Sequence, residues 1–96
     1  MALPKFLQPY LASYDLIALD KIKDKRLIIT EILNKGDDRA IRWMGKNYTL
    51  QDIKDVVSFP TRGMWTKISL SYWTRICDIK LNEKVFDQAI INLNQV

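Results

Sequence analysis

The side chains that could carry chemistry in this chain are mostly cations and aromatic rings, because the usual catalytic groups are scarce. The 96 residues include no histidine and a single cysteine, Cys77. Histidine is the commonest metal ligand and the side chain most used for acid–base catalysis near neutral pH. A zinc site needs several histidine or cysteine ligands, and the three glycines never cluster into a phosphate-binding loop. We therefore expect no enzyme activity, no metal and no cofactor.

Two further groups have plainer explanations than chemistry. Asp37 and Asp38 could bind a cation, but adjacent acids at the start of a helix usually cap it and interact with its dipole. Cys77 follows Tyr72 and Trp73 closely, which predicts a small buried hydrophobic residue rather than a reactive thiol. A single unpaired cysteine also fits a reducing cytoplasm better than secretion.

Three cations form the first candidate binding surface. Arg39, Arg42 and Lys46 have the spacing i, i+3, i+7, which places them on one stripe of a helix beside its apolar stripe. Such a stripe could contact a phosphate backbone or an acidic protein surface. The alternative is an ordinary solvated helix face.

The second candidate surface is the window from residue 56 to residue 77, which contains no acidic residue. It combines cations with aromatic residues, namely Arg62, Lys67 and Arg75 with Phe59, Trp65, Tyr72 and Trp73. Cations mixed with aromatic rings can bind nucleic acid, and the same enrichment is typical of protein-binding hot spots. Helical spacing offers a third explanation for Tyr72 and Trp73, as core residues. Trp65 lies beside Gly63 in a predicted loop, so we expect it to be the exposed aromatic residue. The predicted partner-binding residues are Arg39, Arg42, Lys46, Arg62, Trp65 and Lys67.

The elements that must position these side chains are helices. Apolar residues recur every three or four positions, and cap and stop signals separate the segments. We predict helices at residues 24–35, 38–47, 50–58, 66–79 and 82–93, and a short first helix that Pro4 begins and Pro9 ends or kinks. No strand-like alternation or internal repeat is present. The sequence predicts an all-α, compact single domain of five or six short helices over residues 1–96, with an aromatic arm at 1–14 and a C-terminal helix within 80–96.

Particular residues predict where the helices begin and end. Gly36 stands where a helix would close in the left-handed conformation, so we expect a positive φ there. Asp37 or Asp38 can cap the next helix, and Thr49 with Asp52 forms an acidic variant of the capping box.

The two C-terminal helices have caps and predicted inward faces of their own. Thr66 and Asn82 are the expected caps. The apolar residues expected to face inward are Ile68, Tyr72, Trp73 and Ile76 on the first helix and Phe86, Ala89, Ile90 and Leu93 on the second. We also expect Trp43 and Trp73 to be largely buried.

Composition limits the class of partner. The net charge of +4 is mildly basic, and 48% apolar with 27% charged residues is typical of a globular protein. No apolar run approaches the roughly 20 residues that cross a bilayer, so we expect no membrane partner. Residues 36–58 resemble a helix-turn-helix weakly, because Asp52 and Asp55 of the would-be recognition helix would face phosphates.

Four segments, LPKFLQPYLASYD, LIITEILNKGD, AIRWM and RGMWTKISLSYW, are distributed over roughly residues 3–76. In combination they resemble a small bacterial family of unknown function whose members are often encoded beside nucleotidyltransferase toxins of the abortive-infection type. The resemblance implies no established activity, cofactor or catalytic residue. It suggests a non-enzymatic protein-interaction module, an antitoxin-like or accessory partner of such a toxin. The alternative is a small helix-turn-helix-like regulator that binds nucleic acid, and homo-oligomerisation remains open.

Overall fold

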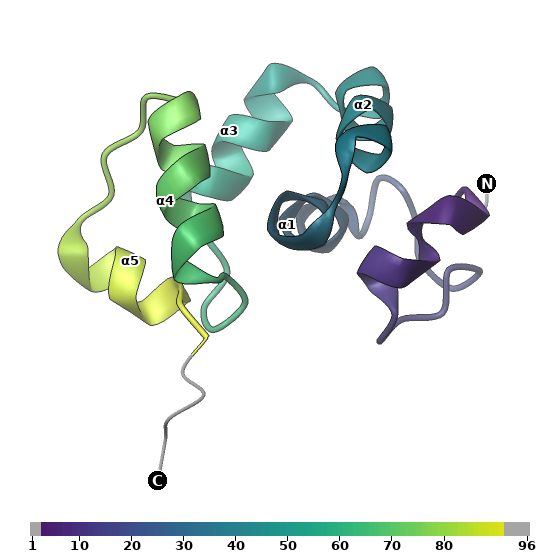
Figure 1. Cartoon of the computed structure of the whole chain (residues 1–96), viewed down its shortest axis with the longest axis horizontal. Helices are drawn as coiled ribbons and strands as arrows, with labels where there is room; N and C mark the ends of the chain where they lie inside the picture. The colour runs from purple at the N-terminus through teal and green to yellow at the C-terminus, as the bar shows by residue number, and fades with distance from the viewer. Residues whose placement is uncertain (1–2, 92–96) are drawn as a thin grey trace, which may run out of the picture.

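Six helices follow one another along residues 3–91, the part of the chain that the structure, a computed structural model, describes (Figure 1). They are the 3₁₀-helix η1 (Lys5–Leu11) and the α-helices α1 (Lys25–Lys35), α2 (Asp38–Asn47), α3 (Leu50–Ser58), α4 (Lys67–Ile76) and α5 (Glu83–Ala89). The described residues form no sheet. The predicted all-α fold is therefore confirmed.

The boundaries of α2 and α3 agree with the prediction because side chains satisfy the free amide groups at their first turns. The carboxylate of Asp37 accepts a hydrogen bond from the backbone N–H of Ala40 at 3.0 Å. Thr49 and Asp52 form a complete capping box, in which each side chain accepts from the other residue's N–H at 3.0 Å. Local side-chain chemistry thus fixes where both helices begin.

The last two helices also begin at their predicted caps but are shorter than expected. The Thr66 hydroxyl accepts from the N–H of Ser69, and the Asn82 side chain accepts from the N–H of Lys84. α4 ends at Ile76, three residues before the predicted end. α5 ends at residue 89, and the predicted continuation to 93 falls partly outside the described residues.

Gly36 does not have the predicted left-handed conformation. Its φ is −71° and its ψ is 151°, which is ordinary extended backbone. Glycine is needed here for its size, because a Cβ atom would lie 2.6 Å from the carbonyl oxygen of Ile32 and 3.2 Å from the Cβ of Ala40. α1 and α2 therefore approach each other closely at this junction. The glycine with a positive φ is Gly63, in the loop before α4.

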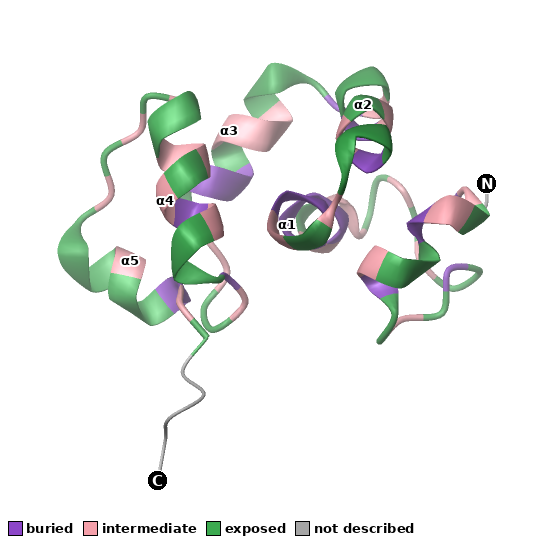
Figure 2. Cartoon of the chain, in the orientation of Figure 1, coloured by how far each residue is buried: buried purple, intermediate pink, exposed green. Residues whose placement is uncertain are grey.

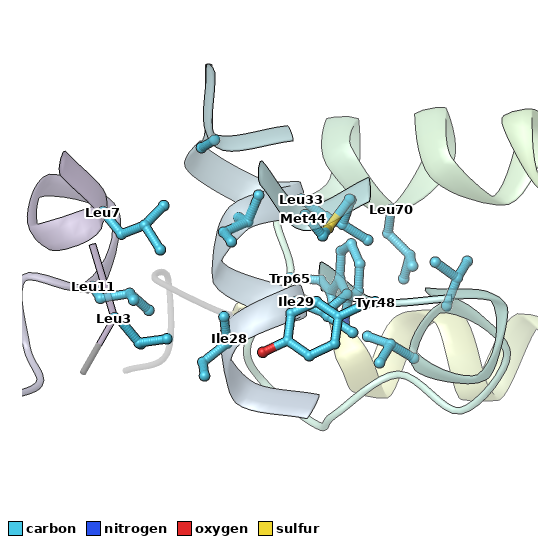
Figure 3. Packing of buried hydrophobic residues seen from close by; sticks show 14 of the residues in the cluster. Leu3, Leu7, Leu11, Ile28, Ile29, Leu33, Met44, Tyr48, Trp65 and Leu70 are labelled. Atoms are coloured by element: carbon cyan, nitrogen blue, oxygen red, sulfur yellow. The ribbon is translucent and has the colours of Figure 1, made fainter. Parts of the chain in front are cut away.

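The core is built around α1, which contacts η1, α2, α3 and α4. Figure 2 shows α1 as the most continuously buried helix of the chain. Figure 3 shows Leu7 and Leu11 of η1 approaching from one side of α1 and Leu70 of α4 lying on the other. α1 thus separates η1 and α2 from α4 and α5.

Trp65 is fully buried, with an exposed fraction of 0%, so the prediction that it is an exposed aromatic residue is wrong. Its backbone N–H donates to Ala89 at 2.9 Å, and its carbonyl accepts from Ile91 at 2.8 Å. These bonds form a short parallel bridge between the loop before α4 and the end of α5. Trp65 therefore joins the C-terminal part of the chain to the core.

The other two tryptophans and the cysteine lie at the margin of the core. Trp43 and Trp73 are half-buried against it, less covered than predicted. Cys77 is also half-buried, and burial raises the pKa of its thiol. A raised pKa favours the protonated thiol, although Cys77 is less covered than the sequence predicted.

Candidate functional site

The predicted partner-binding residues do not form one surface. Arg39, Arg42 and Lys46 lie on α2, whereas Arg62 precedes α4 and Lys67 begins it. Figure 1 shows α2 and α4 apart, with α1 and α3 between them. Trp65 is buried and is not available to a partner.

The orientation of α4 is set by polar contacts with the C-terminal end of α1. The indole N–H of Trp73 donates to the carbonyl oxygen of Leu33 at 2.9 Å. The side chain of Asn34 donates to Met64 and accepts from the N–H of Thr66, each at 3.0 Å. Asn34 thus binds the loop and the first turn of α4 together. Asn34 could not be selected from local sequence patterns, because its partners lie about 30 residues away.

The outer face of α4 carries large apolar side chains that the prediction placed in the core. Ile68 is 84% exposed, Tyr72 54% and Ile76 59%, at the spacing i, i+4, i+8. α4 has two apolar stripes, and the one that contains Leu70 and Trp73 packs on α1. The other stripe faces outward as a continuous apolar row.

Two cations border this row. Lys67 and Arg75 line a shallow hollow of about 370 Å³ together with Ile68, Ser71 and Tyr72. Within residues 3–91 the ion pairs join Lys25 to Asp52 and Lys35 to Glu31, so neither of these two cations is ion-paired. We refer to Lys67, Ile68, Tyr72, Arg75 and Ile76 as the α4 face.

One carboxylate lies near the edge of the α4 face. Asp87 of α5 shares a neighbouring hollow of about 250 Å³ with Lys67. It forms no ion pair with Lys67. The α4 face itself carries two cations and no carboxylate.

Another hollow lies between η1 and α2, with a volume of about 310 Å³. Its lining residues are Phe6, Arg39, Arg42, Trp43 and Lys46, which we call the α2 hollow. The guanidinium carbon of Arg39 lies 4.0 Å from the centre of the Phe6 ring, a cation–π contact. No carboxylate lines the hollow. The whole predicted cationic stripe of α2 is thus gathered beside two aromatic rings.

A more voluminous hollow carries no comparable chemistry. It has a volume of about 600 Å³ and lies at the start of the seven-residue α5, where its lining residues are Asn82, Glu83, Lys84, Asp87 and Gln88. Carboxylates and a cation are mixed there without an aromatic or aliphatic side chain. Among residues 3–91, no group of three or more cysteine or acidic side chains is placed to hold a metal ion. No helix in this range is long and apolar enough to cross a membrane.

Comparison with known proteins adds no functional assignment. No protein-family model, curated protein or solved structure matches the chain. The chemistry and geometry of the α4 face and the α2 hollow are therefore the basis for assigning a function.

Proposed function

We propose that this protein is a non-enzymatic interaction module whose α4 face binds an acidic amphipathic segment of another protein. The observation that supports this proposal is the row of Ile68, Tyr72 and Ile76, each more than half exposed. A contiguous apolar patch bordered by polar groups marks an interaction site. The spacing of the row along one helix suits a partner helix that lies against it.

The charges around the row favour an acidic partner. Lys67 and Arg75 border it, and no acidic residue occurs from residue 56 to residue 77. Pairing with a second copy through the same face would bring the cations of both copies to one interface. Like charges at an interface cost free energy, so the proposed partner is a different protein with carboxylates on its contact surface.

The resemblance noted in the sequence supplies a candidate for this partner. We propose a nucleotidyltransferase toxin of the abortive-infection type, with this protein as its antitoxin-like or accessory subunit. A toxin of that class binds nucleotides and nucleic acid, and a small partner would inhibit it by covering its active cleft. The single cysteine supports a cytoplasmic setting for this role.

The helix-turn-helix alternative has weaker support. In α3, Asp52 is held by the capping box and by an ion pair with Lys25 at 2.9 Å. Asp55 accepts a hydrogen bond from Gln51 on the exposed side of the same helix. A recognition helix that presents carboxylates to DNA phosphates would be repelled, so this use of α3 is not our proposal.

The test begins by identifying the partner at the α4 face. A photoreactive amino acid at Tyr72 should cross-link a distinct protein in the native host, whereas the same amino acid at Ile17 should not. Ile17 is a matched control because it is 84% exposed and lies in the segment between η1 and α1. The cross-linked protein is then produced in pure form for a binding measurement.

The binding measurement compares two substitutions of equally exposed isoleucines. Ile68→Ser should raise the dissociation constant at least tenfold, since loss of a hot-spot side chain costs about 2 kcal/mol or more of binding free energy. Ile17→Ser should leave the dissociation constant unchanged. Both variants should keep the wild-type unfolding free energy within about 0.5 kcal/mol, as expected of surface positions. Equal effects of the two variants, or a dimer of this chain that Ile68→Ser dissociates, would contradict the proposal.

A further inference from the structure

We infer that the α2 hollow is a binding site for single-stranded nucleic acid, separate from the α4 face. The inference is carried by the meeting of three cations and two aromatic rings in one concave surface of about 310 Å³. It does not depend on the proposed protein partner, because α1 separates the two surfaces.

The cations of the α2 hollow are available to phosphate groups. Nε of Arg42 donates a 3.4 Å hydrogen bond to the backbone carbonyl of Asp38. This bond does not involve the two terminal nitrogens of the guanidinium, which can therefore bind a phosphate. Neither Arg39, Arg42 nor Lys46 belongs to an ion pair within the described residues. Among residues 3–91 no carboxylate forms an ion pair with these three side chains, so their N–H groups remain available to phosphates, whose binding releases counterions from the nucleic acid.

The aromatic residues add a surface on which a base can stack. Phe6 holds the planar guanidinium of Arg39 against its ring, and the outer face of that cation is suited to stacking on a base. The ring of Trp43 is braced by an edge-to-face contact with Tyr48, with 5.9 Å between the ring centroids. Two rigid aromatic groups are thus positioned before any ligand arrives.

The lining of the hollow favours a nucleic-acid strand over an acidic peptide. An acidic amphipathic peptide needs aliphatic contacts, which the α4 face offers and which are missing from the lining of the α2 hollow. Base faces, in contrast, pair with aromatic rings and arginine. A duplex keeps its base faces stacked inside, so a single strand is the form that can use both features.

The length of the cationic stripe sets the size of the site. From Arg39 to Lys46 the helix rises about 10 Å, at roughly 1.5 Å per residue. This distance accommodates two or three nucleotides of an extended strand. We therefore expect up to three phosphate contacts, one for each cation.

The experiment measures fluorescence anisotropy of a labelled oligothymidylate of about a dozen nucleotides, a length within the usual site sizes of single-strand binders. With three phosphate contacts, the logarithm of the affinity should fall with that of salt at a slope of about −2, which weakens binding about 20-fold between roughly 50 and 200 mM. Arg42→Ala should reduce the slope by about 0.7, the value for one phosphate contact. Lys80→Ala removes an exposed charge elsewhere and should leave the slope unchanged.

A second variant tests stacking separately from charge. Arg39→Lys keeps the charge but removes the planar guanidinium, so it should weaken binding at least about fivefold without changing the salt slope. An unaffected affinity in this variant would overturn the inference, as would equal slope losses in Arg42→Ala and Lys80→Ala. No binding at low salt would also overturn it. Thymidine monophosphate that binds as tightly as the oligothymidylate would instead assign the hollow to a free nucleotide. Equally tight binding of a duplex would assign it to duplex backbone, and equally tight binding of a poly-glutamate peptide would assign it to an acidic protein.

Discussion

Replacement of Trp65 by alanine should be among the most damaging single changes in this chain. The side chain is fully buried, and the backbone of the same residue pairs the loop before α4 with the end of α5. Removing the indole leaves a cavity between the core and the C-terminal part of the chain. We expect the backbone hydrogen bonds to persist while the packing behind them is lost.

The magnitude follows from the burial and from the state of the indole nitrogen. Replacing a buried tryptophan by alanine costs about 3–5 kcal/mol. Nε1 of Trp65 is buried and has no hydrogen-bond partner among residues 3–91, and such a donor already costs about 1–3 kcal/mol in the native protein. Because the substitution also removes that donor, we expect a loss near the lower limit, about 3 kcal/mol. A chain of this length is stable by roughly 5–14 kcal/mol, so a loss of about 3 kcal/mol is a large part of the total. At about 4–8 °C per kcal/mol, Trp65→Ala should lower Tm by about 12–24 °C.

The assay is urea unfolding followed by circular dichroism, with Trp65→Phe as the paired variant. Phenylalanine keeps most of the apolar contact and removes the unpaired N–H, so it should cost less than half as much as alanine. Trp73→Phe is the control, because the indole N–H of Trp73 does donate a hydrogen bond, to the carbonyl of Leu33. Its removal should cost the free energy of that bond, about 0.5–1.5 kcal/mol. If Trp65→Ala lowered the unfolding free energy by less than about 1 kcal/mol, the structural role would be refuted and Trp65 would have to be a surface residue.

Three further predictions concern the helix junctions and pH dependence. Gly36→Ala should destabilise by about 1–3 kcal/mol in urea unfolding, because its Cβ would meet the carbonyl of Ile32 at 2.6 Å; a neutral result would contradict this. Thr49→Ala should cost about 1 kcal/mol by the same assay through loss of the capping box, and unchanged stability would argue against that cap. Burial raises the pKa of Tyr48 to about 12 from 10.0, and its hydroxyl lies 2.8 Å from the carbonyl of Lys21. Stability from the neutral phenol should be complete below pH 10 and lost as pH rises through 12, and Tyr48→Phe should remove this part of an alkaline unfolding profile.

Helix positions were predictable because their causes lie within a few residues of one another. Each of the caps Asp37, Thr49, Asp52 and Thr66 accepts a hydrogen bond from a backbone amide three positions away. Such contacts can be inferred from spacing alone. They account for the agreement at the starts of α2 and α3, where a side chain caps the free backbone amides.

Burial was less predictable because it depends on contacts distant in sequence. Trp65 lies two residues after Gly63 in a loop, and its pairing with residues 89 and 91 shows that it is enclosed. Likewise α4 has two apolar stripes, so periodicity identifies a helix without showing which stripe meets the core. That choice depends on hydrogen bonds from Trp73 and Ser69 to the end of α1.

The candidate surfaces were also predictable only in the part that depends on residues close in sequence. Spacing alone placed Arg39, Arg42 and Lys46 on one stripe, but Phe6 joins them from a segment 33 residues earlier than Arg39. Only the fold shows that the cations of α2 accompany two aromatic rings, whereas those of α4 border a row of two isoleucines and Tyr72. Positive charge is common to both surfaces and attracts any acidic ligand, so it cannot distinguish partners. The apolar groups between the charges must do so, flat rings favouring nucleobases and branched aliphatic chains favouring a protein helix.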